Sequence, residues 1–120
     1  MSKILVVEDS PSMRQLISTS LKASGHNVEE AEDGVVGVEK SQREVFDLII
    51  SDVKMPNKDG LELTAALRAM PEYQYTPIIL LTSIDDEKLK EKGRQIGATG
   101  WLLKPFDSET LIRAIKKVLR

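Results

Sequence analysis

The segment KILVVEDSPSM, residues 3–13, decides the fold of this 120-residue chain. A short apolar run at residues 4–7 is followed at once by Glu8 and Asp9, and then by Ser10 and Pro11. The apolar run predicts a buried strand over residues 3–7. Serine as a helix N-cap, with proline at the first helical position, predicts that a helix begins directly afterwards. The segment therefore predicts a β-α unit whose strand ends in two carboxylates, which call for a compensating positive charge nearby.

The same alternation of strand and helix recurs four more times. We expect further strands at about 27–31, 47–51, 77–81 and 100–103. We expect further helices at about 33–43, from about 60 to the proline at 71, at 86–96 and from 108 onward. The first helix is expected to end at Gly25 and to bury an apolar face formed by Met13, Leu16, Ile17 and Leu21. Five β-α units in succession predict an α/β fold, a doubly wound parallel sheet in a single domain spanning residues 1–120.

The composition excludes several classes of function. The net charge of −2 gives no general attraction to nucleic acid or to membranes, and no segment of about 20 apolar residues is present. The absence of cysteine excludes disulfides and thiolate chemistry, and a single histidine, His26, cannot form a multi-histidine metal site. We interpret His26 as a surface residue without function. A cytoplasmic domain that contacts neither nucleic acid nor membrane is the expectation.

Polar residues stand where four of the predicted strands end. Glu8 and Asp9 follow the first strand, Asp52 the third, Thr82 the fourth and Lys104 the fifth. In open parallel sheets, ligands bind outside the carboxyl ends of the strands, so these side chains are expected to form one site. Taken singly, each has an ordinary explanation as a cap, a turn residue, a strand-end hydroxyl or a solvated charge. Their order across five β-α units favours the joint site.

These residues carry a resemblance that extends over essentially the whole chain. The chain resembles a response-regulator receiver domain, and the stretch GATGWLLKPF at residues 97–106 is most similar to the CheY-type chemotaxis subgroup. The other matching motifs are EDSPSMR at 8–14, DVKMP at 52–56 with DG at 59–60, and LTS at 81–83. The resemblance implies a flavodoxin-like fold with five helices and the strand order 2-1-3-4-5, of which CheY is a standard example.

The resemblance further implies that Asp52 is a phosphoacceptor. It would take a phosphoryl group from the phosphohistidine of a CheA-like sensor histidine kinase. The implied cofactor is Mg²⁺, with Mn²⁺ as a possible substitute, because a hard cation prefers oxygen ligands. The implied ligands are Glu8, Asp9, Asp52 and the backbone carbonyl of Lys54.

The implied output is a two-state switch without turnover as an enzyme. Lys104 and the Thr82 hydroxyl would hold the phosphoryl oxygens, and Thr82 and Trp101 would change position together. The face formed by helix four, strand five and helix five would then bind an output protein, such as a flagellar motor switch component, in chemotaxis. For Trp101, an ordinary partly buried aromatic residue remains the alternative.

Three positions depart from the usual pattern or modify it. Glu8 stands where aspartate is common, Lys54 lies two residues after Asp52, and the apolar Ile84 lies two residues after Thr82. A cation beside an acyl phosphate can pair with Glu8 or compete for the phosphoryl oxygens, so the lifetime of the phosphorylated form is open in both directions. The chain ends after its fifth helix, which suggests a stand-alone protein, although a regulator with a further domain is the alternative.

Three other functions are less consistent with the sequence. A Mg²⁺-dependent phosphatase with Asp52 as nucleophile needs a general acid two residues later, where Lys54 is poorly suited at neutral pH. A flavin-binding protein would need hydroxyls and amides after the first strand, whereas Glu8 and Asp9 repel phosphate. A degenerate receiver that works without phosphorylation is disfavoured because Asp52, Thr82 and Lys104 are all present.

Overall fold

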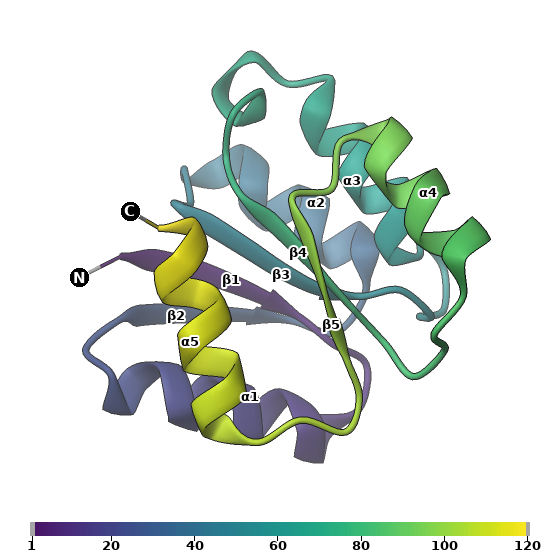
Figure 1. The fold of residues 1–120 in the computed structure, drawn as a ribbon. Coiled ribbons are helices and arrows are strands. Elements are labelled where there is room, and N and C mark those ends of the chain that lie inside the picture. Colours follow the sequence, from purple (N-terminus) through teal and green to yellow (C-terminus); the bar gives the residue numbers. More distant parts are fainter. Residues whose placement is uncertain (1, 120) are drawn as a thin grey trace.

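The computed structural model describes residues 2–119 and shows one parallel sheet between two layers of helices (Figure 1). The strands are β1 (Lys3–Val7), β2 (Asn27–Ala31), β3 (Leu48–Asp52), β4 (Ile78–Thr82) and β5 (Gly100–Leu103). The helices are α1 (Pro11–Ala23), α2 (Gly34–Arg43), α3 (Gly60–Arg68), α4 (Glu87–Ile96) and α5 (Ser108–Val118), with a 3-10 turn η1 (Pro71–Tyr73). The strand order is β2-β1-β3-β4-β5, and every neighbouring pair is parallel. The predicted doubly wound, flavodoxin-like architecture is confirmed.

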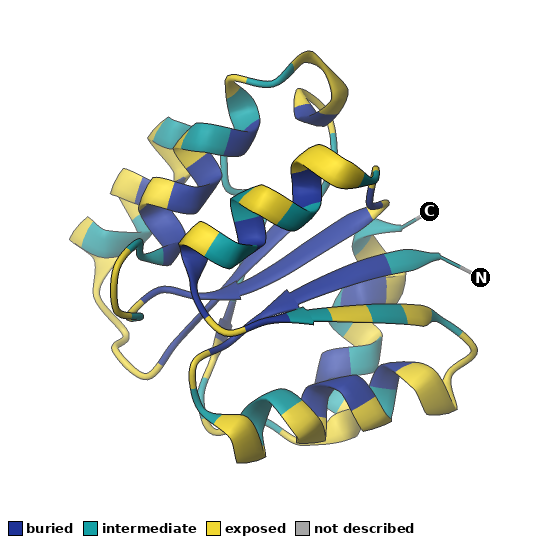
Figure 2. Cartoon of the chain, turned by 180° about the vertical axis from the view of Figure 1, so that it is seen from behind, coloured by how far each residue is buried: buried dark blue, intermediate teal, exposed yellow. Residues whose placement is uncertain are grey.

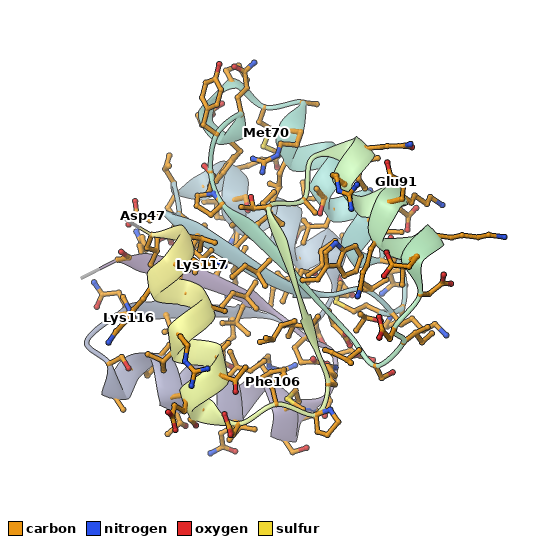
Figure 3. All side chains as sticks on the ribbon, viewed as in Figure 1. Asp47, Met70, Glu91, Phe106, Lys116 and Lys117 are labelled. Carbon is orange, nitrogen blue, oxygen red and sulfur yellow. The ribbon has the colours of Figure 1, made fainter. Side chains whose placement is uncertain are left out.

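The two helical layers cover two separate apolar clusters. Helices α1 and α5 lie on one face of the sheet, and α2, α3 and α4 lie on the other (Figure 1). The three central strands are buried along most of their length, whereas β2 alternates between exposed and half-buried residues (Figure 2). Phe106, just after β5, packs against the cluster below α1 and α5 (Figure 3). Burial on both faces explains why the central strands are nearly continuous apolar runs.

Side-chain caps begin the first three helices, and the predicted cap at Ser10 is confirmed. The Ser10 hydroxyl accepts a hydrogen bond from the amide of Met13, with Pro11 at the first helical position of α1. Asp33 is the N-cap of α2 rather than its first residue, and Asp59 forms a capping box with Glu62 at α3. Each of these caps satisfies backbone N–H groups that have no partner within the helix.

Several local predictions were wrong. Strands β3 and β4 begin and end one residue later than expected, so Asp52 and Thr82 are their last residues rather than the residues after them. Leu16 is exposed although it was assigned to the buried face of α1. Pro71 not only follows α3 but also begins the turn η1, which the sequence pattern does not predict. His26 is half-buried, and its Nδ1 accepts a hydrogen bond from the amide of Ser2.

None of the helices formed by residues 2–119 combines the length and apolar character needed to span a bilayer.

Candidate phosphorylation and metal site

Three carboxylates, two directly after β1 and one at the end of β3, meet at the carboxyl edge of the sheet. Oxygens of Glu8, Asp9 and Asp52 lie within 4.8 Å of one another. Glu8 is almost completely buried, with 1% of its surface exposed, and Asp52 is buried as well, whereas Asp9 is exposed to solvent. This is the cluster that the sequence predicted, with an open side at Asp9.

Alternation along the strands selects which side chains converge. Val6, Ile50 and Leu102 all belong to the cluster beneath α1 and α5. Because side chains alternate between the faces of a strand, residues two positions further along lie on the same side. Those residues are Glu8, Asp52 and Lys104. Three separate strands therefore deliver their charged groups to one side of the sheet edge.

Backbone hydrogen bonds extend the sheet past the ends of its strands and hold these residues in place. The amide of Glu8 donates to the carbonyl of Ala31 over 3.0 Å, and the amide of Lys104 donates to the carbonyl of Thr82 over 2.8 Å. The Lys104–Pro105 peptide bond is cis. The site is thus built on sheet backbone rather than on a free loop.

Lys104 supplies the positive charge that the two carboxylates after β1 called for. Its Nζ lies 3.0 Å from Oε1 of Glu8 and 3.0 Å from Oδ2 of Asp52. Burial by itself lowers the pKa of Lys104, but hydrogen bonds to Asp52 and Glu8 outweigh that effect and leave the pKa above its ordinary value. The ammonium group is therefore charged at neutral pH and lies between two carboxylates.

The surroundings of Glu8 disfavour the ionised form of its carboxyl group. Burial is the main cause that raises its pKa, and the negative charge of Asp52 adds to this rise. The amide of Ser10, which donates to Oε2 over 3.1 Å, and the Lys104 ammonium oppose it, but the pKa stays above its ordinary value. A further cation near Glu8 would lower the cost of keeping this buried side chain ionised.

The donor set fits a hard divalent cation. All three clustered side chains offer carboxylate oxygens, and one of them is open to solvent, so a bound ion could keep water ligands there. Lys54, whose backbone carbonyl is the fourth expected ligand, lies two residues after Asp52 in the loop between β3 and α3, with its side chain exposed.

Thr82 lies at the same edge but faces the other helical layer. It shares the side of Leu80, which belongs to the cluster beneath α2, α3 and α4, and so does Trp101. The Thr82 hydroxyl accepts a hydrogen bond from the amide of Ile84 over 3.1 Å. Thr82 therefore bonds the loop that leads into α4 through its hydroxyl, and it bonds the Lys104 amide through its carbonyl.

Trp101 is half-buried, and its indole packs against α4 at Gly93, which has no side chain. A β-carbon placed at Gly93 would lie 2.3 Å from Cζ2 of the indole and 3.1 Å from Cη2. No real side chain tolerates such a contact, so the indole occupies its position only because residue 93 is glycine. Gly93 is thus the partner of Trp101.

Replacing Gly93 with alanine is expected to displace the indole toward solvent. The tryptophan emission of the unphosphorylated protein should shift to longer wavelength, and quenching by iodide should increase, because Trp101 is the only tryptophan. Lys92→Ala, at an exposed position of the same helix, controls for the change in helix propensity and should leave the emission unchanged. An unaltered spectrum in Gly93→Ala would contradict this account.

Sequence reasoning missed three polar residues that join separate elements of the fold, the first two of them beside the site. Arg14 donates to the carbonyl of Glu8 over 2.7 Å and also pairs with Glu30 on β2. Asn57 donates to Asp33 across the loop after β3. Arg68 donates to the carbonyl of Gly97, where α4 ends. Arg14 and Asn57 lie inside or beside the motifs, but nothing in the sequence pattern shows which groups they bond.

Comparison with known proteins agrees with this geometry. A family model described as the response regulator receiver domain matches residues 4–116. The chain is 37% identical over 119 residues to the Protein PilH of Pseudomonas aeruginosa. The alignment covers 99% of this chain and 98% of PilH. It is 38% identical over its full length to the response regulator ArlR of Staphylococcus saprophyticus but spans only about half of that relative, 53%.

Solved structures show the same fold. The chemotaxis protein CheY4 of Vibrio cholerae superposes with a TM-score of 0.97 at 45% identity, covering 99% of both chains. The receiver domain of the sensor histidine kinase PA1611 from Pseudomonas aeruginosa superposes with a TM-score of 0.91 at 31% identity, covering 98% of this chain and 97% of its own. That structure holds a magnesium ion coordinated in its active-site cleft.

Proposed function

The chain belongs to the response regulator receiver domain family, and from this premise we propose that it is a phosphorylation-dependent switch whose acceptor is Asp52. A phosphohistidine of a sensor histidine kinase would donate the group. The Asp52 carboxylate oxygen attacks phosphorus, the N–P bond breaks, and an acyl phosphate and a free imidazole result. The observation that carries the proposal is Lys104 held 3.0 Å from Asp52, beside two further carboxylates.

Glu8, Asp9, Asp52 and the carbonyl of Lys54 would hold Mg²⁺, with Mn²⁺ as a substitute. The ion supplies positive charge that offsets the repulsion between the carboxylates and the incoming phosphoryl group. The oxygen-only donor set and its open side at Asp9 support this assignment.

Lys104 and Thr82 would hold the transferred group from two sides. The Lys104 ammonium already contacts an Asp52 oxygen, so it can donate to a phosphoryl oxygen placed there with little movement. The Thr82 hydroxyl would turn from the amide of Ile84 toward the phosphoryl group. This turn would change the loop before α4, and Trp101, which packs against α4, would respond.

The face formed by α4, β5 and α5 is the proposed output surface. A groove between β5 and α5 runs along it and is lined in part by Trp101, Leu102, Arg113 and Lys117. An output protein would bind there in the phosphorylated state, in a chemotaxis pathway of the cytoplasm, with a CheA-like kinase upstream. The likeness to CheY4 supports this part, as does PilH, a relative of the same length.

We further propose that the protein acts as a switch and not as a phosphatase. A phosphatase of this design needs a general acid two residues after the nucleophile, and Lys54 stands there with an exposed ammonium.

Incubation with a small-molecule phosphodonor and Mg²⁺ tests the proposal. Intact-mass analysis should show one added phosphoryl group, and Trp101 emission should change along with it. Both signals should disappear in Asp52→Asn and persist in Asp47→Asn, a matched change at the opposite end of the sheet. Phosphoryl uptake by Asp52→Asn would mean that another residue is the acceptor.

A further inference from the structure

The loop between β3 and α3, residues 53–59, is attached to a helix that contributes nothing to the acidic cluster. Nδ2 of Asn57 donates to Oδ2 of Asp33 over 2.8 Å, and the amide of Gly34 donates to the carbonyl of Lys58 over 3.1 Å. Asp33 is the N-cap of α2 and Gly34 its first residue. We call these two hydrogen bonds the α2 clasp.

The clasp depends on two local features of the backbone. Asn57 has φ +69°, in the left-handed region that asparagine adopts more readily than most residues. Gly34 approaches the loop so closely that a β-carbon there would lie 2.4 Å from the Lys58 carbonyl oxygen. Both residues are therefore suited to this contact, which explains why α2 begins with a glycine despite its low helix propensity.

Asp33 uses both of its oxygens. Oδ1 accepts the amide of Val36 over 2.9 Å as the helix cap, and Oδ2 accepts from Asn57. These two hydrogen bonds lower the pKa of Asp33, so the carboxylate is ionised at neutral pH. A charged acceptor gives a stronger bond to the Asn57 amide than a neutral one.

The clasp acts on the segment that carries Lys54. Within residues 2–119, it provides the hydrogen bonds that join residues 54–58 to another element. The ends of the loop are attached elsewhere: the amide of Val53 donates to the carbonyl of Leu81 on β4 over 2.9 Å, and Asp59 caps α3. Between these ends, Lys58 donates to Pro56 over 2.7 Å. Lys54 therefore lies between an attachment to β4 at Val53 and the attachment to α2 at residues 57–58, so the position of its carbonyl depends on both.

We propose that Asn57 and Asp33 are positioning residues for the metal site, because the α2 clasp holds the C-terminal side of the short segment that carries the Lys54 carbonyl. This inference rests on the proposed function. Mg²⁺ requires nearly ideal octahedral geometry, so a ligand on a loosened loop binds it less well. Groups that orient metal ligands without touching the ion typically change the affinity by about 10- to 100-fold in tightly held sites.

Asn57→Gly tests the inference most directly. Glycine keeps the left-handed backbone without strain and removes only the amide of the clasp. Titration of the metal-free full chain with Mg²⁺, followed by calorimetry and by backbone amide shifts, should give a dissociation constant raised by about tenfold. Phosphorylation should be slow at low Mg²⁺ and should recover at saturating Mg²⁺, since Asn57 touches no reacting atom.

An exchange of donor and acceptor provides a rescue. The double variant Asp33→Asn with Asn57→Asp keeps the net charge and re-forms the bond with the amide on the other side. Asparagine is as good an N-cap as aspartate, so α2 keeps its cap. Its Mg²⁺ affinity should lie within about twofold of the original chain, unlike that of Asn57→Gly.

Tyr73→Phe serves as the control for general destabilisation. The Tyr73 hydroxyl bonds the carbonyls of Ser41 and Glu44 and the amide of Phe46, at the opposite end of the sheet. Its removal should lower the thermal midpoint but leave Mg²⁺ affinity unchanged.

The outcomes distinguish a failure of the proposed function from a failure of the positioning role. If the original chain fails to bind Mg²⁺, the proposed function is wrong, and this inference is wrong with it. If the original chain binds but Asn57→Gly binds equally well, whether or not its midpoint falls, only the positioning role is overturned.

Discussion

Replacing Lys104 with methionine is expected to lower the free energy of unfolding of the metal-free protein by about 3 kcal/mol at neutral pH. The reason is Glu8, which is almost completely buried and would lose its hydrogen-bonded cation. Removing one partner of a buried pair leaves the other charge uncompensated, which costs far more than losing an exposed pair. Phosphorylation of Asp52 should also slow by about a hundredfold, because the ammonium would no longer neutralise the phosphoryl oxygens.

The loss of stability in Lys104→Met should grow as the pH rises from acid to neutral. Burial and Asp52 already hold the pKa of Glu8 above its ordinary value, and removing the Lys104 ammonium raises that pKa further. Between the ordinary pKa and the raised one, native Glu8 binds a proton that the unfolded chain does not, so stability falls as pH rises. The deficit of Lys104→Met should therefore be small below about pH 4 and largest near neutrality.

Urea unfolding in the presence of a chelator, repeated over a series of pH values, measures this directly. Lys90→Met is the matched control, because Lys90 pairs with Asp85 at the surface over 2.7 Å. Exposed pairs are worth at most about 1 kcal/mol, so its effect should be small and nearly independent of pH in the acidic range. A Lys104→Met protein as stable as the original at pH 7 would show that Glu8 does not depend on this cation.

Replacing Gly60 with alanine is expected to damage the site through the backbone of Asp52. A β-carbon at position 60 would lie 2.3 Å from the Asp52 carbonyl oxygen and 3.1 Å from the Cα of Val53. These are backbone atoms, which cannot turn away as a flexible side chain can. The end of β3 must therefore shift, with a stability loss of about 3 kcal/mol. Phosphorylation should slow by about tenfold or more, since the nucleophile moves with its strand.

Gly100→Ala gives the matched control for this variant. A β-carbon at Gly100, the first residue of β5, meets no atom within 4 Å. That variant should fold and accept phosphate like the original chain in thermal unfolding and phosphodonor assays. Equal behaviour of the two alanine variants would mean that the close approach of Gly60 to β3 is not required.

The fold was predictable because each level of the sequence agrees with the others. Apolar runs of strand length alternate with helical patterns, and caps such as Ser10 stand at the junctions. The place of the site followed from chain direction alone, because parallel strands end at one edge. The strand order and the roles assigned to the residues came from the resemblance to receiver domains and not from the periodicity.

The errors arose where a contact joins segments far apart in the chain. Leu16 fits the helical spacing of α1, but the face that α1 buries is narrower than that spacing suggests. Asn57 reads as a turn residue after Pro56, and its bond to Asp33 spans 24 positions. The role of Gly93 becomes visible only when the indole of Trp101 is placed beside it. Such pairings follow from packing in three dimensions, and local propensity says nothing about them.

The attachment of Arg68 has a mechanical consequence for α4. Its guanidinium group holds the Gly97 carbonyl with two hydrogen bonds, of 3.0 and 2.8 Å, and also bonds the Tyr73 carbonyl. The opposite end of the helix begins at Glu87 and is capped by the exposed Asp86. The C-terminal end of α4 is thus anchored to α3 through Arg68, whereas its N-terminal end depends on an exposed cap. Amide hydrogens should therefore exchange fastest near Glu87 and progressively more slowly toward Ile96.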